Sequence, residues 1–217
     1  MKKIRAVIFD LDGTLANTLP LCISAFRKSI EPLISRNVSD NEIIATFGPS
    51  EEGTIMALAP NHYEKGVADY LTHYEMLHDM CRAPFDGVVE LLELLKNKGI
   101  ATAMVTGKGR KSAAMSLERF GISQYFEVLE TGMPEGPSKP KGIQAVLDAF
   151  DNIARDEVIY VGDAPSDITA CRQVGIPIIA AAWAETAEPE KLIAMHPDEL
   201  FYDVPSFAKW LETKISF

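Results

Sequence analysis

The sequence predicts an α/β fold: a Rossmann-like parallel sheet with helices on both faces, plus an inserted all-helical cap domain. The chain opens with an almost continuous apolar run at residues 4–9 that ends in two aspartates, as a strand buried on both faces does. From residue 84 onward, helical and strand-like patterns alternate, which predicts parallel strands joined by crossover helices. Residues 17–83 interrupt this alternation and carry helical patterns only.

The boundaries of the two parts follow from where the strand pattern stops and where it resumes. We expect residues 1–16 together with residues 84–217 to form the Rossmann-like core, and residues 17–83 to form the helical cap. Within the cap, each expected helix start is a capping residue followed by an acidic residue in the first turn. These starts are Ser39, Ser50 and Asn61.

The segment after residue 84 supplies the remaining expected elements. Each helix has apolar residues at helical spacing and either ends at a glycine or begins with a proline. Each strand is a short apolar run. Helices are expected at residues 87–98, 108–120, 140–150 and 165–174, and strands at residues 100–105, 125–129, 158–161 and 177–182.

Composition limits the partners and the compartment. The 217 residues carry a net charge of −10, so the phosphates of nucleic acids and of anionic membrane surfaces would repel the chain. No apolar run reaches the ~18 residues that a membrane-spanning helix needs. Three scattered cysteines, Cys22, Cys81 and Cys171, form no CxxC pair, which favours buried thiols in a reducing cytoplasm.

The end of the first strand carries the strongest chemical signal. Asp10 and Asp12 are spaced i, i+2, so both carboxylates would leave the carboxyl end of the strand on the same side. Two neighbouring acids suit a hard cation such as Mg²⁺, or a pair in which one attacks and the other moves a proton. A plain Asp-Gly turn at residues 12–13 is the alternative.

Three later segments place further polar residues where the same sheet edge is expected. Thr106 follows the second strand, Lys139 precedes a helix, and Asp163 and Asp167 follow the strand at residues 158–161. Taken one at a time, they could be a strand end, a solvated lysine and a helix cap. Together they form a set in which carboxylates hold Mg²⁺ and donors hold a phosphate.

These motifs, in this order, resemble the haloacid dehalogenase-like phosphohydrolases, in particular phosphoglycolate phosphatase-like members with a helical cap of the first type. The resemblance covers about residues 4–16 and 84–183. It implies that Asp10 is the nucleophile and that Asp12 is the general acid and base. It also implies a Mg²⁺ site made by Asp10, the backbone carbonyl of Asp12, Asp163 and Asp167.

The resemblance further implies a phosphate site made by Thr106, Gly107 and Lys139. The sequence departs from the family pattern at two of its positions. Gly107 stands where the family often has asparagine, which removes a side-chain amide, and Gly142 stands where a second proline is common after Lys139. Cap residues that could reach a substrate include Gly48, Ser50, Glu51 and Arg82.

The resulting hypothesis is a Mg²⁺-dependent phosphomonoester hydrolase that acts on a small phosphorylated metabolite through an aspartyl phosphate. A phosphomutase, an inorganic pyrophosphatase and an inactive phosphate-ligand-binding module on the same fold are the alternatives. A dinucleotide-binding loop at residues 107–112 is a weaker one, because the third glycine of G-x-G-x-x-G is missing. The sequence indicates no oligomeric state.

Overall fold

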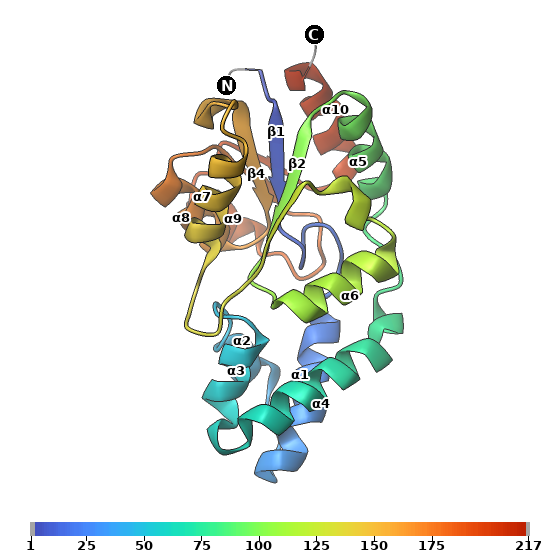
Figure 1. Cartoon of the computed structure of the whole chain (residues 1–217), viewed down its shortest axis with the longest axis vertical. Helices are drawn as coiled ribbons and strands as arrows, with labels where there is room; N and C mark the ends of the chain where they lie inside the picture. Colours follow the sequence, from blue (N-terminus) through green and yellow to red (C-terminus); the bar gives the residue numbers. More distant parts are fainter. Residues whose placement is uncertain (1–2, 216–217) are drawn as a thin grey trace.

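A computed structural model of the chain describes residues 3–215 and is built on one six-stranded sheet (Figure 1). The strands lie in the order β3-β2-β1-β4-β5-β6, and every neighbouring pair is parallel. The predicted α/β fold with a parallel sheet is therefore confirmed. The strands are β1 (Ala6–Phe9), β2 (Ala101–Val105), β3 (Val128–Glu130), β4 (Val158–Gly162), β5 (Ile178–Ala181) and β6 (Glu199–Phe201).

The helices fall into two groups along the chain. Between β1 and β2 come α1 (Leu19–Ile34), α2 (Asp40–Ile44), α3 (Glu51–Leu58), α4 (Tyr63–Met76) and, last, α5 (Val88–Asn97), which already belongs with the sheet. The others are α6 (Arg110–Phe120), α7 (Lys139–Ala149), α8 (Pro165–Val174), α9 (Pro189–Ala194) and α10 (Val204–Ile215). None of the helices within residues 3–215 has the length and apolar character needed to cross a membrane.

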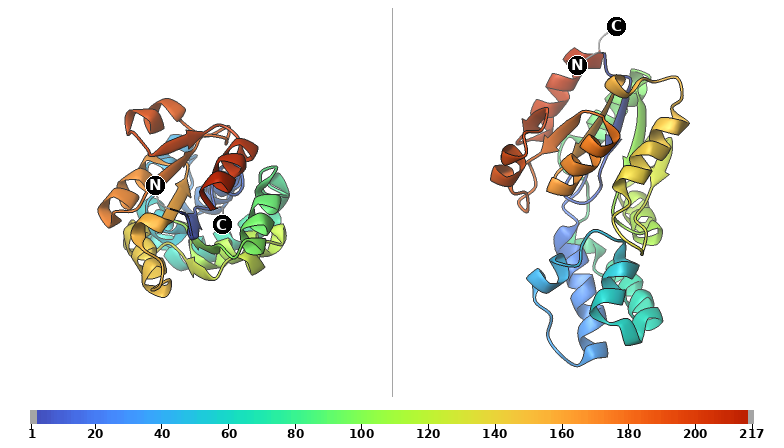
Figure 2. Two further views of the ribbon diagram at one scale, coloured as in Figure 1. Left: turned by 90° about the horizontal axis from the view of Figure 1, so that it is seen from above. Right: turned by 90° about the vertical axis from the view of Figure 1, so that its left-hand side faces the viewer.

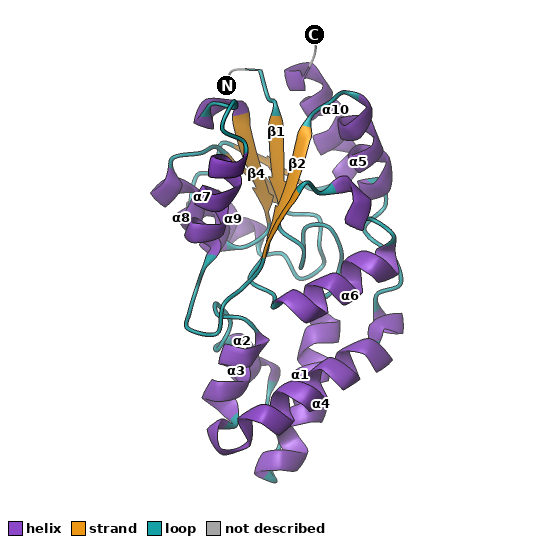
Figure 3. Ribbon diagram, in the orientation of Figure 1, coloured by secondary structure: helices purple, strands orange, loops and turns teal. Residues whose placement is uncertain are grey.

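Helices cover both faces of the sheet (Figures 2 and 3). Strand β1 is buried throughout, and its alternate side chains enter different clusters, Val7 and Phe9 one and Ala6 and Ile8 the other. The first cluster takes in apolar residues of α5, α6 and α10, and the second those of α7, α8 and α9. A strand with helices on both sides must be apolar at every position, which explains the uninterrupted run in the sequence.

Helices α1 to α4 lie beyond the carboxyl ends of the strands (Figure 1). The chain builds β1, β2 and β3 in one direction across the sheet and then crosses to the other side of β1 to form β4. The strand order therefore reverses between β1 and β4, which is where open α/β sheets bind their ligands. The all-helical segment faces this point.

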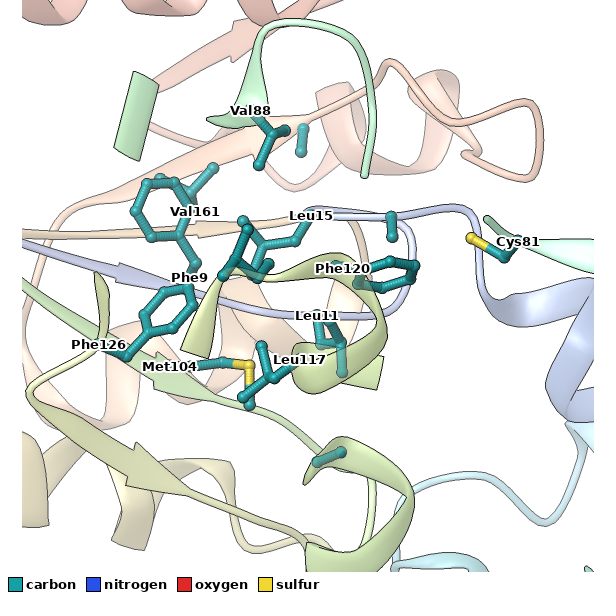
Figure 4. Close-up of a cluster of buried hydrophobic side chains, with 14 of the residues drawn as sticks. Phe9, Leu11, Leu15, Cys81, Val88, Met104, Leu117, Phe120, Phe126 and Val161 are labelled. Atoms are coloured by element: carbon teal, nitrogen blue, oxygen red, sulfur yellow. The ribbon is translucent and has the colours of Figure 1, made fainter. Parts of the chain in front are cut away.

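The loop after β1 is anchored by two buried leucine side chains that pack into the hydrophobic core (Figure 4). Leu11 and Leu15 are almost fully buried and join the same cluster as Phe9, Leu117 and Phe120. Backbone donors at positions 14, 15 and 16 all reach the Leu11 carbonyl, which closes a tight loop. The aspartates on either side of Leu11 are thus held by a rigid support.

Most of the expected elements are confirmed within one or two residues at their ends, but some features differ. Ser39 caps α2 with the full capping box. The capping box expected at Asn61 is wrong, because Pro60 starts a single 3₁₀ turn there and α4 begins at Tyr63 without a side-chain cap. The structure also contains β6, α9 and α10, for which the sequence pattern predicted no element.

Candidate active site

Asp10 stands at the carboxyl end of β1 and is buried, with 4 % of its surface exposed. Its Oδ1 accepts a hydrogen bond of 2.7 Å from the backbone N–H of Leu11. Its Oδ2 pairs with the ammonium group of Lys139. One carboxylate oxygen is thus held by the loop and the other by a cation, which fixes the direction of the side chain.

Asp163 and Asp167 join Asp10 in one acidic cluster. One oxygen from each of the three carboxylates lies within 4.8 Å of the others, a spacing at which a single metal ion could bind all three. Two glycines make room for this cluster: a Cβ at Gly13 would overlap the Asp163 carboxylate, and one at Gly162 would lie 2.5 Å from Oδ2 of Asp167. Gly13 also has φ +77°, a conformation that favours glycine.

Asp167 is fully buried in the first turn of α8 and is held on several sides. Its Oδ2 accepts the N–H of Ala164 at 3.0 Å, and its Oδ1 contacts both Lys139 and the Tyr160 hydroxyl. Lys139 therefore bridges Asp10 and Asp167. It occupies the first turn of α7 rather than the loop before it, where the sequence had placed it.

Burial and the crowding of these charges move their pKa values. Burial raises the pKa of Asp10 from 3.8 to about 6; Lys139 opposes this shift, while Asp167 and Asp12 add to it. Burial, together with the charges of Asp10 and Asp167, raises the pKa of Asp163 well above its usual value. Burial disfavours the charge on Lys139, but the two carboxylates beside it outweigh burial and raise its pKa. The cluster therefore has a strong tendency to bind positive charge.

Asp12 faces a different set of partners from Asp10. Its Oδ1 accepts the hydroxyl of Thr18, lies 3.2 Å from Nζ of Lys108, and lies 3.8 Å from the thiol of Cys22. Its carboxylate is not part of the three-carboxylate cluster. The two aspartates predicted to act together therefore sit in different surroundings, one among acids and the other beside a buried lysine.

Lys108 is the main site residue that the sequence did not reveal. Its side chain is 2 % exposed, and Nζ donates to Cys22 Sγ at 3.0 Å and lies 4.5 Å from the centre of the Tyr74 ring. Burial is the largest single effect and lowers its pKa, but Asp12 together with Cys22, Tyr74 and Tyr70 outweighs burial and raises the pKa. The sequence feature that could have identified Lys108 is its place two positions after Thr106. The same loop resembles a dinucleotide-binding motif, which directed attention to its glycines.

Thr106 and Gly107 lie at the end of β2, next to β1 in the sheet. The Thr106 hydroxyl accepts the N–H of Lys108 at 3.2 Å, and its own N–H bonds to the Glu130 carbonyl. A Cβ at Gly107 would meet only the Gly48 carbonyl, at 3.9 Å, so space for a side chain remains there. Both residues line the same cavity as Asp10.

That cavity has a volume of about 780 Å³ and lies between the strand ends and the helical segment. Asp10, Asp12, Asp163 and Lys139 line it from the sheet. Two of the four expected cap residues, Gly48 and Glu51, also line it. Ser50 is buried beside it, with its N–H on the Met133 carbonyl at 3.0 Å. Arg82 is exposed, and its ion-pair partner among the described residues is Asp79, at 3.9 Å.

Glu51 reaches from α3 across to the start of α6. Its carboxylate accepts the N–H of Gly109 at 2.6 Å and the hydroxyl of Ser112 at 2.5 Å. In a dinucleotide-binding protein the pyrophosphate would occupy this helix start. The chain's own carboxylate is there instead, which disfavours the dinucleotide alternative.

Comparison with known proteins gives consistent matches. Residues 7–181 match the family model described as haloacid dehalogenase-like hydrolase. Pyrophosphatase PpaX of Bacillus pumilus is 30 % identical over 197 residues, which span 90 % of this chain and 90 % of the relative. Pyrophosphatase PpaX of Halalkalibacterium halodurans is 29 % identical over 205 residues, 94 % of each chain.

Solved structures agree on the fold. A haloacid dehalogenase-like family hydrolase from Streptococcus pneumoniae matches with a TM-score of 0.77 at 24 % identity, covering 95 % of this chain and 98 % of that one. CbbY from Rhodobacter sphaeroides, solved in complex with phosphate, matches with a TM-score of 0.76 at 19 % identity, covering 92 % and 94 %. At these identities the likeness concerns the fold alone.

Proposed function

This chain belongs to the haloacid dehalogenase-like hydrolase family, and we propose that it is a Mg²⁺-dependent phosphomonoester hydrolase acting through an aspartyl phosphate on Asp10. One observation carries the proposal. Asp10 stands at the point where the strand order reverses, among two further carboxylates and one lysine, with Asp12 two residues away. This is the chemistry that attack on a phosphate needs: a fixed carboxylate, positive charge and a second acid.

The residues present fit a Mg²⁺ ion. Three carboxylates within 4.8 Å would repel one another strongly, and glycines at positions 13 and 162 leave room for them to remain close. We propose that Asp10, Asp163, Asp167 and the backbone carbonyl of Asp12 hold the ion. When bound, Mg²⁺ would neutralise charge on the phosphate and align it for in-line attack.

In the first half of the reaction, a carboxylate oxygen of Asp10 forms a bond to phosphorus. The bond from phosphorus to the ester oxygen breaks, and its electron pair goes to that oxygen. Asp12 gives its proton to the same oxygen, so the alcohol leaves in neutral form. The products of this half are the alcohol, ionised Asp12 and the aspartyl phosphate.

In the second half, Asp12 takes a proton from water while the water oxygen bonds to phosphorus. The bond from phosphorus to the Asp10 oxygen breaks, which restores the Asp10 carboxylate and releases inorganic phosphate. Throughout, Lys139 offsets negative charge on Asp10 and on the transferring group. We assign binding of the phosphate oxygens to Thr106 and to the backbone of Gly107.

We further propose that residues 17–83 act as a cap that covers the site during the reaction. Residues on α1, α3 and α4 line the cavity, and Ser50 and Glu51 bond to the core. Such a cover would keep bulk water away from the aspartyl phosphate until the alcohol has left. The boundaries remain those expected from the sequence.

A second candidate is inorganic pyrophosphate as substrate, because relatives at about 30 % identity are named pyrophosphatase. It uses the same nucleophile and the same metal, and differs only in the leaving group. A phosphomutase and an inactive binding module use the same fold, and turnover to free inorganic phosphate separates a hydrolase from both.

The test is release of inorganic phosphate from p-nitrophenyl phosphate and from a panel of phosphorylated metabolites, with and without Mg²⁺. We expect Mg²⁺-dependent turnover by the wild type and its loss in Asp10→Asn. The matched control is Asp86→Asn, the same change at an exposed residue outside the cavity. Absence of turnover across the panel, or full activity in Asp10→Asn, would contradict the proposal.

A further inference from the structure

The cavity has a charged side and an apolar side. Both lysines and most of the acids come from the loops and helix starts that follow the strand ends, where the phosphate would bind. The opposite side is formed by the proposed cap and would face the leaving group. Its lining is mainly apolar or aromatic, and includes Leu19, Cys22, Phe26, Phe47, Pro49 and Tyr70.

The aromatic residues on the cap side form a connected wall. The ring of Phe26 lies 4.3 Å from that of Tyr70 and 6.0 Å from that of Phe47, measured between centroids. The Cys22 thiol beside them stays neutral, because burial raises its pKa to about 12. Such a surface binds apolar parts of a ligand well and cannot replace the water around an anion.

Among the described cap residues that line the cavity, Glu51 is the one acid, and it is fixed in place. Glu51 is 4 % exposed and accepts hydrogen bonds from Gly109 and Ser112. Gly109 is needed for this contact, because a Cβ there would lie 2.7 Å from the carboxylate carbon of Glu51. The Glu51 carboxylate therefore has a fixed position in the lining of the cavity.

The cations of the cavity are already matched by acids. Among the described residues that line it, the only cations are Lys108 and Lys139. Lys139 pairs with Asp10 and Asp167, and Lys108 pairs with Asp12. No arginine or lysine of the cap residues lines the cavity. The Lys108 ammonium contacts Cys22 on the cap side but is paired with Asp12, so a second anionic group on a substrate would find no unpaired cation there.

We infer that this chain selects phosphomonoesters of uncharged alcohols with apolar surface, and that Glu51 is a specificity-determining residue that disfavours leaving groups carrying a second negative charge. The inference rests on the proposed phosphatase function. It predicts that pyrophosphate and phosphorylated carboxylic acids are poor substrates of this chain. An anion in that position would be desolvated against aromatic rings and would face a fixed carboxylate.

The experiment compares phenyl phosphate with 4-carboxyphenyl phosphate and with pyrophosphate, using the full chain at saturating Mg²⁺. The two phenyl esters share a reacting group and differ by one remote charge. We expect kcat/KM for phenyl phosphate to exceed that for each anionic substrate by about tenfold or more. Equal or greater kcat/KM for 4-carboxyphenyl phosphate or pyrophosphate would overturn the inference while leaving the proposed hydrolase in place.

Two variants test the role of Glu51 itself. Glu51→Gln keeps the shape: its amide oxygen can accept the Gly109 N–H while its NH2 donates to the Ser112 hydroxyl. We expect it to reduce the preference for phenyl phosphate by about tenfold. The matched control is Glu52→Gln, which removes a charge one residue away, outside the lining, and should leave the ratio unchanged. An unchanged ratio in a folded Glu51→Gln protein would overturn the assignment to Glu51.

A further variant does not depend on the Glu51 contact. Phe47→Lys places a cation at a partly exposed position of the apolar wall. It should raise kcat/KM for 4-carboxyphenyl phosphate relative to phenyl phosphate, and failure to do so would count against the charge argument. Absence of Mg²⁺-dependent turnover of all three substrates would instead overturn the proposed function, and this inference with it.

Discussion

Lys108 Nζ lies 3.2 Å from Asp12 Oδ1, and both side chains are held within a closed network. Thr18 donates to the same oxygen, and Cys22 contacts both partners. Thr18 and Cys22 belong to the helical segment, at the start of α1, and Lys108 belongs to the loop after β2. The network therefore sets the orientation of the proposed acid and base from both parts of the chain.

Replacing Lys108 with methionine should impair proton donation by Asp12. A neutral side chain of similar length cannot hold the Asp12 carboxylate in place. The loss of kcat should therefore be greatest for esters whose leaving oxygen is strongly basic and must be protonated. We expect kcat for an alkyl phosphate to fall by about 10²-fold, and kcat for p-nitrophenyl phosphate to fall much less. The comparison is made from kcat and KM on both esters.

The matched control for this change is Lys111→Met, which removes a charge from an exposed residue of α6. It should affect neither ester. An equal fall on both esters in Lys108→Met would indicate a structural role for Lys108 and would contradict the positioning of Asp12.

Asp163→Ala tests the metal site. Loss of one of the three clustered carboxylates should raise the Mg²⁺ concentration needed for half-maximal activity by about tenfold or more. EDTA should abolish turnover by the wild type, and Ca²⁺ should inhibit it, because its larger and irregular coordination misaligns in-line attack. Full activity in EDTA would exclude a metal role for the cluster.

Stability in the absence of metal should depend on pH through Asp10. Its pKa is 3.8 in the unfolded chain and about 6 in the folded one, so the folded state binds the proton more tightly. The stabilisation that this proton provides is complete below about pH 4 and is lost as the pH rises through about 6. Mg²⁺ competes with the proton and should restore stability above that range.

Thermal unfolding with and without Mg²⁺ measures this effect. We expect the increase in Tm on adding Mg²⁺ to be larger at about pH 8 than at about pH 5. For a chain of this length, each additional kcal/mol of Mg²⁺ binding free energy should raise Tm by about 2–4 °C. In Asp10→Asn the difference between the two pH values should shrink. The same increase in Tm at both pH values in the wild type would contradict the account.

Gly107→Asn should be tolerated and should tighten phosphate binding. Gly107 has no positive φ, and its Cβ direction is open apart from the Gly48 carbonyl at 3.9 Å. An added amide could donate to a phosphate oxygen and lower KM up to about tenfold. Gly107→Ala gives the control for the added bulk, and a KM in Gly107→Asn no lower than in Gly107→Ala would contradict the prediction.

A neighbouring glycine gives the opposite expectation. A Cβ at Gly132 would overlap the carbonyl oxygen of Gly107, and the Gly132 N–H bonds to the Lys108 carbonyl at 2.7 Å. Gly132→Ala should therefore lower Tm and displace the loop that carries Thr106 and Lys108. A Tm equal to that of the wild type would show that the loop can move without cost.

The sequence predicted the parallel sheet and the residues at its edge because both depend on local pattern. Apolar runs end at Asp10, Thr106 and Gly162, and parallel strands must bring such ends to one edge. The short strand Glu199–Phe201 was missed because three residues carry no periodic signal. At Asn61 the capping pattern competed with Pro60, and the proline determined the local structure.

The contacts between the helical segment and the core were beyond sequence reasoning. Glu51 and Gly109 are 58 positions apart, and Lys108 and Cys22 are 86 apart. Nothing in either local pattern indicates that these residues meet, because the meeting depends on how the helical segment packs against the strand ends. The proposed catalytic residues could be predicted from motifs, and Glu51 was among the cap residues expected to reach a substrate. The role of Lys108 beside Asp12 and the contact of Glu51 with Gly109 required the structure.

The most direct test of the central claim is chemical trapping of the aspartyl phosphate. Rapid acid quenching during turnover, followed by borohydride reduction, converts an aspartyl phosphate to homoserine, which peptide mass spectrometry locates. We expect homoserine at position 10 only with substrate and Mg²⁺, none in Asp10→Asn, and more in Asp12→Asn with p-nitrophenyl phosphate, because removal of the phosphate needs the Asp12 base. Steady turnover with no modification at position 10, or with modification at another residue, would contradict the account.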